Sequence, residues 1–380
     1  MKDLNKIPSL FGKDRLLSLD ALRGFDMLWI IGGGSLLSVL AELTGADWLA
    51  ALAGQMEHVD WQGFRSFDLI FPLFMFIAGI AIPLSVKSKL IGNTSKNDLI
   101  MKAFKRMIIL ILLGFLYNDL FRDGFENARY ASVLGQIGIA YFFALLIVIF
   151  SKSFKTILFW LVGILGGVAF LQLFVPVPGI GAGILTPHGC INGYIDGLLL
   201  PGRLANNAGG GNGIFAPLAL LCIVSATGIT LMGTIAGNII QRGSYTEYRK
   251  VGILAVTGVS LILVALILSP FYPIIKKCWT TTYNLLAGGI SFLLIALFYL
   301  VIDVWRFQRW SFFFRVIGVN SIFIYLFKEI VSIKHIVISF IGWIAIPMGE
   351  WGSLILALGY LAAVWLLLYF MYKKDIFIKV

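Results

Sequence analysis

The chain has 380 residues, of which 59% are hydrophobic and 13% charged, and its mean hydropathy is +0.93. This composition indicates an integral membrane protein and excludes a soluble enzyme. The formal net charge of +11 does not indicate nucleic-acid binding, because the lysines and arginines lie between apolar runs and form no basic patch interleaved with aromatic residues. The three cysteines are scattered without a C-x-x-C pair, so no metal is expected.

The apolar runs continue for about 20 residues, the length that an α-helix needs to cross the hydrocarbon core, whereas a β-barrel has short alternating segments. The predicted fold is therefore all-α, a polytopic membrane bundle of about ten transmembrane helices at 24–43, 66–86, 104–121, 131–150, 154–175, 214–236, 249–268, 281–301, 313–332 and 351–372. The run 335–347 is shorter and ends at Pro347. We expect a re-entrant or interfacial segment there, with an eleventh span as the alternative.

The basic residues predict how these helices are oriented. With ten spans, 22 of the 30 lysines and arginines lie on the side of the N-terminus, and with eleven spans 19 do. Because cytoplasmic segments carry the excess of basic residues, both termini are predicted to be cytoplasmic. The predicted organisation is a basic cytoplasmic segment at 1–23, one transmembrane domain at 24–372 and a cytoplasmic tail at 373–380.

The segment 55–79 places a histidine at the predicted outer mouth of the second span. His58 lies beside Glu57 and Asp60. Histidine titrates near neutrality, so a histidine at such a site can accept and return a proton. The alternative is an interfacial histidine that hydrogen-bonds a loop. The acidic residues of this connection, with Arg65 as the single basic one, are expected to attract a cationic ligand such as a protonated amine.

Two further segments have unusual composition. The predicted outer loop at 176–213 is long and lacks periodicity, which is typical of a binding or lid element, and its Gly-rich end is not followed by the G-K-[ST] of a P-loop. Gly32, Gly33 and Gly34 lie in the first span, where we expect a helix break or a close helix approach.

Six ordered blocks of sequence resemble the bacterial relatives of heparan-α-glucosaminide N-acetyltransferase. The blocks are RLLSLDALRGFDMLWIIGGG at 15–34, HVDWQGFRSFDLIFPLFMFIAG at 58–79, VLGQIGIAYF at 133–142, GYIDGLLLPG at 193–202, PIIKKCWTTTY at 273–283 and IGVNSIFIYL at 317–326. The resemblance extends over 15–372. Ile30 stands where relatives carry an asparagine, and Lys328 stands where they carry a histidine.

The resemblance implies a transmembrane acetyltransferase of the bacterial cytoplasmic membrane, with a homodimer as the implied oligomer. It implies acetyl-coenzyme A as the cytoplasmic co-substrate and an amino sugar of the glucosamine type as the outer acceptor. Matched motif by motif, the implied catalytic residues are His58, Asp68 and Asn320.

Other residues are candidates for binding the substrates. For the acceptor they are Glu57, Asp60, Trp61, Asp196 and Lys276, and for the coenzyme they are Asp20, Arg23 and Gln136. Each has a structural alternative: Trp61 as a membrane anchor, Asp196 as a helix cap, Lys276 as a flank of a span, and Asp20 and Arg23 as a pair three residues apart on one helix. Polar contact between helices is the alternative for Asp68 and Asn320.

Two chemical routes and one other function stay open. His58 acts either as the general base for direct transfer or as a transient acetyl carrier. The alternative function is a transporter for an amino sugar or related solute, with the same pocket and no acyl chemistry.

Overall fold

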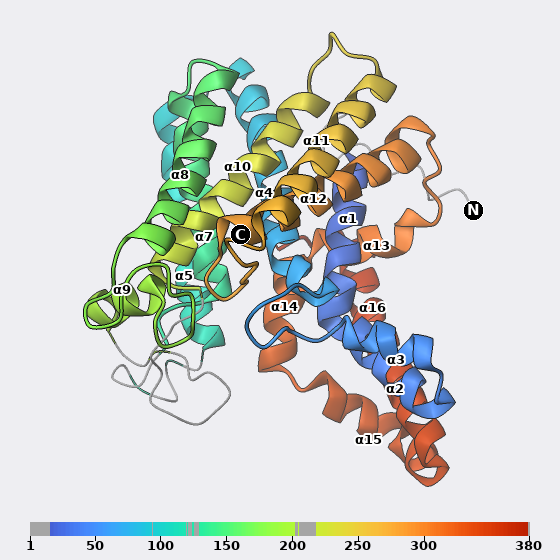
Figure 1. Ribbon diagram of the computed structural model, residues 1–380. Coiled ribbons are helices and arrows are strands. Elements are labelled where there is room, and N and C mark those ends of the chain that lie inside the picture. Colours follow the sequence, from blue (N-terminus) through green and yellow to red (C-terminus); the bar gives the residue numbers. More distant parts are fainter. Residues whose placement is uncertain are drawn as a thin grey trace.

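The computed structural model describes residues 16–92, 94–118, 120, 124, 129–201, 204 and 218–378. Figure 1 shows a bundle of helices, and the described part of the chain forms no named strand, only an isolated bridge between Val177 and Gly181. The all-α prediction is confirmed for these residues. Their helices are α1 Leu17–Leu28, α2 Gly34–Thr44, α3 Asp47–Gly54, α4 Ser66–Ile91, α5 Lys96–Tyr117, α7 Val133–Phe150, α8 Phe154–Phe174, α9 Ile191–Leu199, α10 Leu220–Ile240, α11 Glu247–Leu268, α12 Thr281–Phe298, α13 Ser311–Val319, α14 Ser321–Ile330, α15 Ile333–Ala345 and α16 Glu350–Lys373.

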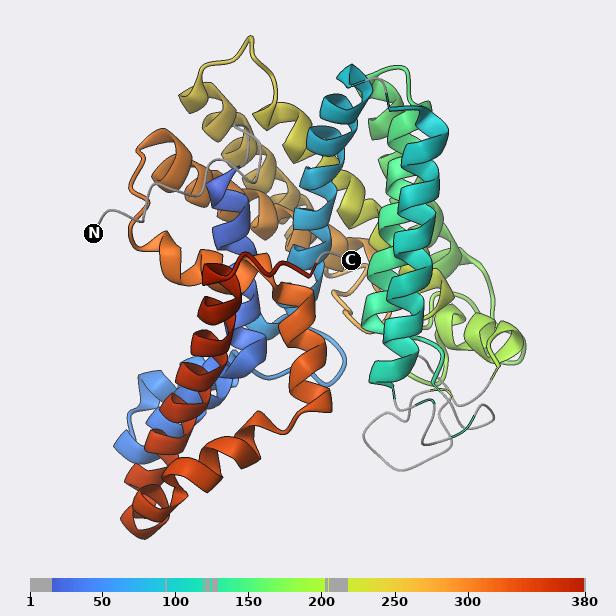
Figure 2. The same ribbon diagram turned by 180° about the vertical axis from the view of Figure 1, so that it is seen from behind.

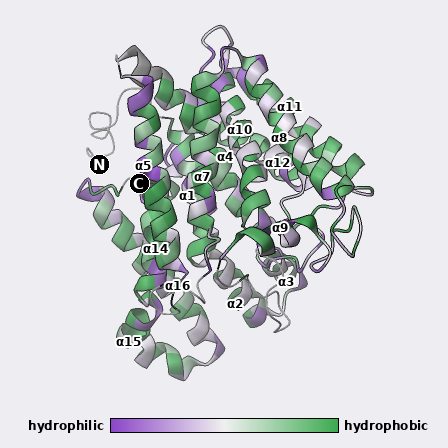
Figure 3. Ribbon diagram, turned by 90° about the vertical axis from the view of Figure 1, so that its left-hand side faces the viewer, coloured by the Kyte–Doolittle hydropathy of each residue, from purple (hydrophilic) through white to green (hydrophobic). Residues whose placement is uncertain are grey.

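Eight helical segments in the described ranges are long and apolar enough to cross a membrane, and each coincides with a predicted span. Figure 3 shows their hydrophobic residues along the length of the bundle. Two predicted spans differ: residues 104–117 of the predicted span 104–121 lie on α5, which is outside these eight, and 313–332 is covered by the bent pair α13 and α14. The segment predicted as re-entrant or interfacial is the short apolar helix α15. A total of ten spans and the cytoplasmic location of the termini stay predictions.

Two predicted spans are broken rather than continuous. A π-helical turn at Trp29–Gly33 separates α1 from α2, and Gly32 has a φ of 133° that favours glycine, so the predicted break lies at the glycine run. A side chain at Gly32 would also press against Tyr360 and Leu361 of α16. The second break is at Asn320, where α13 and α14 meet at 67°. The predicted span 313–332 thus corresponds to two helices with a bend between them, and the pair together is long and apolar enough to cross a membrane.

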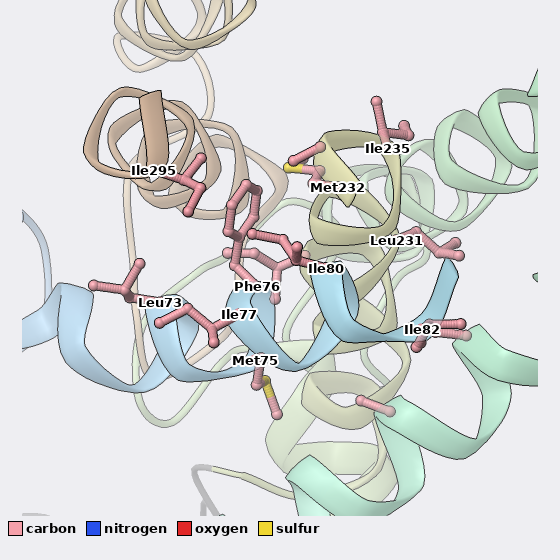
Figure 4. Packing of buried hydrophobic residues seen from close by; sticks show 14 of the residues in the cluster. Leu73, Met75, Phe76, Ile77, Ile80, Ile82, Leu231, Met232, Ile235 and Ile295 are labelled. Atoms are coloured by element: carbon pink, nitrogen blue, oxygen red, sulfur yellow. The ribbon is translucent and has the colours of Figure 1, made fainter. Parts of the chain in front are cut away.

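The core is centred on α4, which packs against α10 and α12. Phe76, Met232 and Ile295 come from these three helices and lie close together (Figure 4). At the crossing of α4 and α10, a Cβ on Gly79 would collide with the backbone of Thr230, and a Cβ on Gly233 with that of Phe76. Small residues thus allow close contact between the two backbones, as is common in membrane bundles, where packing rather than the hydrophobic effect holds helices together.

Connections that are predicted to lie on the same side of the membrane are found at the same end of the helix bundle. The α7–α8 and α10–α11 turns lie at the top of Figure 1, and α9 and the α14–α15 turn lie toward the bottom. Figure 2 shows α15 and α16 side by side, extending below the rest of the bundle. Hydrogen bonds join three of the connections predicted to be on the outer side: Trp61 Nε1 donates to the carbonyl of Leu185 (2.7 Å), and Gly63 N donates to that of Ile274 (2.9 Å).

Candidate functional site

A cavity of about 480 Å³ lies between α4, α7 and α14, with walls from α1, from the end of α5 and from the connections before α4 and α12. Its volume is that of a small-molecule site. Most of the lining is apolar, as at Phe71 and Ile137. The polar and charged residues that line it are His58, Asp68, Tyr117, Arg129, Lys276, Lys277, Ser321, Tyr325 and Lys328. Four of them are basic and one is acidic, so the walls favour an anionic ligand over a cationic one.

Asp68 is the centre of the polar group in this cavity. It lies in the first turn of α4 and is 1% exposed. Its Oδ2 accepts the backbone N–H of Arg65 at 3.1 Å, so the carboxylate caps the helix to which it belongs. A buried carboxylate needs charged or hydrogen-bonding partners, because removal from water is costly for the ionised form.

His58 and Lys276 supply those partners at the other oxygen. His58 Nδ1 lies 2.8 Å from Asp68 Oδ1, and Lys276 Nζ donates to the same oxygen at 3.1 Å. The imidazole packs against Phe67 with ring centroids 4.8 Å apart, and its side chain is 54% exposed. The ring is thus held at one nitrogen and accessible at the other.

Lys276 also approaches the histidine directly, with Nζ 3.0 Å from Nδ1. Burial lowers the pKa of the Lys276 ammonium, and the charge of Asp68 opposes that effect. Two proton arrangements fit these distances. Either Nδ1 carries a proton that it donates to Asp68, or Lys276 donates to an unprotonated Nδ1.

The first arrangement makes His58 a base. When Nδ1–H donates to a carboxylate, the lone pair of neutral imidazole is on Nε2, and a fixed tautomer with a free Nε2 is what general-base catalysis requires. The Asp68 carboxylate also stabilises the imidazolium after proton uptake. Tyr283 helps to fix the position of Asp68, since the Tyr283 hydroxyl donates a hydrogen bond to the Asp68 backbone carbonyl at 2.8 Å.

The remaining candidates for the acceptor lie outside the cavity lining. Glu57 pairs with Arg65 at 3.1 Å on the surface, and Asp60 is exposed. Trp61 packs with Leu185 and has Lys277 Nζ 5.9 Å from its ring centre, so it holds the outer loop in place. The structure therefore does not bring these three to His58.

Asp196 lies on α9 and connects it to α10. Its Oδ1 accepts the backbone N–H of Leu220 at 3.2 Å, at the N-terminus of α10, which agrees with the capping alternative. Burial raises the pKa of Asp196 to about 7, against the opposing effect of the Leu220 N–H. Of the predicted outer loop 176–213 that carries Asp196, residues 202–203 and 205–213 lie outside the described residues.

The candidates for the coenzyme and the late asparagine are in helix contacts. Arg23 and Asp20 pair with each other at 3.6 Å on α1. Gln136 donates to the carbonyl of Cys222 at 3.0 Å, which connects α7 to α10. Asn320 donates to the carbonyl of Ile376 and accepts from Ile378 N, both at 3.0 Å, so it holds the segment after α16 at the α13–α14 break. None of these four lines the cavity.

A second polar cluster in the cavity wall was not among the predicted site residues. Tyr117 and Tyr325 stack with centroids 4.8 Å apart, and Tyr117 donates to Glu329 at 3.3 Å. Lys328 Nζ lies 3.5 Å from Glu329 Oε1 and donates to the carbonyl of Ile30 at 3.4 Å. Ile30 and Lys328 are both departures from the motifs that the chain resembles, and that pair of departures is a signal that could have pointed to this cluster.

The fold and the cavity define a class: a multi-pass helical membrane protein with an Asp–His–Lys group at a ligand-sized cavity. Residues 15–179 match a family described as a domain of unknown function, DUF5009. The chain is 28% identical to heparan-alpha-glucosaminide N-acetyltransferase of Homo sapiens over 373 residues, covering 83% of this chain and 53% of that protein. It is 26% identical to the Mus musculus protein of the same name over 326 residues, covering 73% and 49%.

These matches confirm that the chain resembles heparan-alpha-glucosaminide N-acetyltransferase, as the six blocks of sequence indicated. The chain spans about half the length of the curated relatives that it matches.

Proposed function

We propose that this protein is a transmembrane acetyltransferase that moves an acetyl group from cytoplasmic acetyl-coenzyme A to the amine of a glucosamine-type sugar on the outer side. The observation that carries the proposal is the His58 imidazole, anchored at Nδ1 on buried Asp68 and lining a 480 Å³ cavity. The matched relatives are named as N-acetyltransferases, which supports the reaction class. In this proposal the protein has one transmembrane domain, resides in a bacterial cytoplasmic membrane and forms a homodimer.

The chemistry begins with the acceptor nitrogen as a neutral amine, because an ammonium has no lone pair and first releases one proton to water. In the proposed step, the amine attacks the thioester carbonyl carbon, and His58 Nε2 accepts the proton that the nitrogen loses as the C–N bond forms. A C–N bond forms, the C–S bond breaks and coenzyme A leaves as a thiolate. The imidazolium then returns the proton to the thiolate, so that neither protons nor electrons are left over.

Lys276 and Lys277 have a separate role in this proposal. Both line the cavity, and Lys276 contacts His58, so their ammonium groups favour the negative charge that develops on the carbonyl oxygen in the transition state. Asp68 holds the tautomer, and the apolar walls at Phe71 and Phe74 exclude water from the thioester. A route through an acetylated His58 uses the same residues in two steps.

The test uses purified protein with radiolabelled acetyl-coenzyme A and glucosamine. His58→Ala should lower the rate by about 10²- to 10⁴-fold, the range for loss of a general base. His335→Ala is the matched control, because His335 is exposed on α15 and does not line the cavity, and it should act as wild type.

Two results would contradict the proposal. Equal acetylation by wild type and His58→Ala would remove the assigned site. The second result concerns sealed vesicles that contain the protein. If they accumulate labelled glucosamine without acetyl-coenzyme A, and form no acetylated product when acetyl-coenzyme A is added, the transporter is favoured instead. An acetyl-enzyme trapped in wild type and missing in His58→Ala would select the two-step route.

A further inference from the structure

A second groove, of about 560 Å³, lies between α8, α10, α11 and α12 and shares no lining residue with the His58 cavity. Its lining is apolar over most of its length, with Phe154, Leu161, Met232, Ile253 and Phe292 among its walls. Nothing in the acetyl-transfer proposal uses it. The helices α8 and α11, which form two of its sides, are among the least buried of the eight candidate spans, so the groove lies on the surface predicted to face lipid.

Three of the four polar residues that line the groove gather at one end, and the fourth, Thr257, lies halfway along α11. Arg242 and Tyr245 come from the α10–α11 turn, and Asn238 lies one turn earlier on α10. Figure 1 shows this turn at the top of the bundle, the end that the charge distribution predicts to be cytoplasmic. The groove is thus amphipathic, with an apolar length and a basic mouth.

Arg242 lines the groove at that mouth, and Arg249 contacts the same tyrosine from the start of α11. The guanidinium carbons of Arg242 and Arg249 lie 4.7 Å and 4.4 Å from the centre of the same Tyr245 ring. The Thr246 hydroxyl accepts the N–H of Arg249, and Tyr245 N donates to the carbonyl of Arg242, so the turn holds both arginines in place. Cation–π contacts offset part of the repulsion between two like charges.

The acidic residue of this turn does not neutralise them. Glu247 is held by Lys250 at 2.9 Å and by the hydroxyl of Tyr299. Within the described ranges, neither Arg242 nor Arg249 forms an ion pair. Two guanidinium groups that contact the same tyrosine ring and lack an acidic partner in the described ranges offer N–H donors of the kind with which arginine recognises a phosphate.

We propose that this groove binds an anionic phospholipid, with the phosphate at Arg242 and Arg249 and one acyl chain along the apolar walls. Charge complementarity selects the headgroup, since basic pockets between transmembrane helices at the cytoplasmic side recognise anionic lipids. The apolar length of the groove selects a ligand with a hydrocarbon chain over a soluble phosphate. The site is independent of the acetyltransferase chemistry and stands if that proposal fails.

The experiment measures thermal unfolding of the full chain in neutral detergent with added phosphatidylglycerol or phosphatidylcholine. Phosphatidylglycerol should raise the melting temperature of wild type by several degrees more than phosphatidylcholine does. Arg242→Gln combined with Arg249→Gln should remove that difference. Arg309→Gln, a matched exposed arginine outside the groove, should retain it.

Separate measurements distinguish the sources of phosphate. Glycerol 1-phosphate, which lacks acyl chains, should not reproduce the stabilisation at the same concentration. If it does, the site binds a soluble phosphate and the lipid assignment is wrong. Equal stabilisation by the two lipids in wild type, or an equal loss in Arg309→Gln, would also overturn it. If the double variant does not fold, native mass spectrometry of Arg242→Gln alone must show reduced retention of phosphatidylglycerol.

Discussion

Asp68 has three hydrogen-bonding neighbours because a carboxylate that is 1% exposed is stable as an anion only when its charge is matched. The backbone N–H of Arg65 comes from its own helix turn, and His58 comes from ten residues before it. Lys276 comes from 208 residues further along the chain. The local partners set the position of the carboxylate, and the distant lysine supplies the balancing charge.

This arrangement predicts strong energetic coupling between Lys276 and Asp68. Lys276→Met alone leaves a buried carboxylate without its cation and should destabilise the protein by roughly 1–3 kcal/mol. Adding Asp68→Asn should cost less than the sum of the two single changes, because the unmatched charge is then gone. The coupling in a double-mutant cycle, measured by unfolding in detergent, should be about 0.5–3 kcal/mol.

The exposed pair Glu57 and Arg65, also 3.1 Å apart, is the control for this cycle. Its coupling should stay below about 1 kcal/mol, since solvent screens exposed ion pairs. A Lys276–Asp68 coupling as small as that of the control pair would show that the lysine does not balance the carboxylate.

Helix α4 carries the site residue at its first turn and the main contact with α10 further along. Gly79 is the residue that permits this contact, since a Cβ there would meet the Thr230 backbone. Neither backbone can move far without disturbing the Phe76–Met232 packing shown in Figure 4. The element that positions Asp68 is thus held by a close helix crossing.

Gly79→Ala should therefore destabilise the protein, by roughly 1–3 kcal/mol, as overpacking of a core does. Gly163→Ala on α8 is the matched control, because a Cβ at Gly163 has open space around it. That variant should be neutral or up to about 1 kcal/mol more stable, from helix propensity. Equal melting temperatures for the two variants would contradict the close crossing.

The stability of the whole molecule should depend on pH through Asp196. Its pKa is raised by burial to about 7, well above the ordinary value of 3.8. Between these values the folded protein holds a proton that the unfolded chain has released, so stability falls as pH rises and the fall ends above about pH 7. The loss amounts to at most roughly 4 kcal/mol.

Asp196→Asn should flatten this dependence, since the amide oxygen still accepts the Leu220 N–H but carries no charge. Melting temperatures measured from pH 5 to pH 8 should drop less for the variant than for wild type. Asp60→Asn, on an exposed aspartate, should follow wild type. A pH profile of Asp196→Asn that overlays that of wild type would exclude this residue as the source.

The sequence alone predicted most of the helices, because a run of about 20 apolar residues has few alternatives to a membrane-crossing helix. It also pointed to His58 and to Asp68, which lie close along the chain and belong to one motif. The break at Gly32 followed from three adjacent glycines. The break at Asn320 did not, because a polar residue in an apolar run has the same pattern whether the helix bends there or continues.

Only the tertiary structure decided which polar residues meet. Lys276 reaches His58 across 218 residues, and Lys328 reaches Ile30 across 298, through the packing of helices that no local pattern specifies. In the same packing, Glu57, Asp60 and Trp61 lie outside the cavity lining, although they are neighbours of His58 in the sequence. Residues that are neighbours in the sequence are close in space, but the direction in which each side chain points depends on the local backbone and on the helices that surround it.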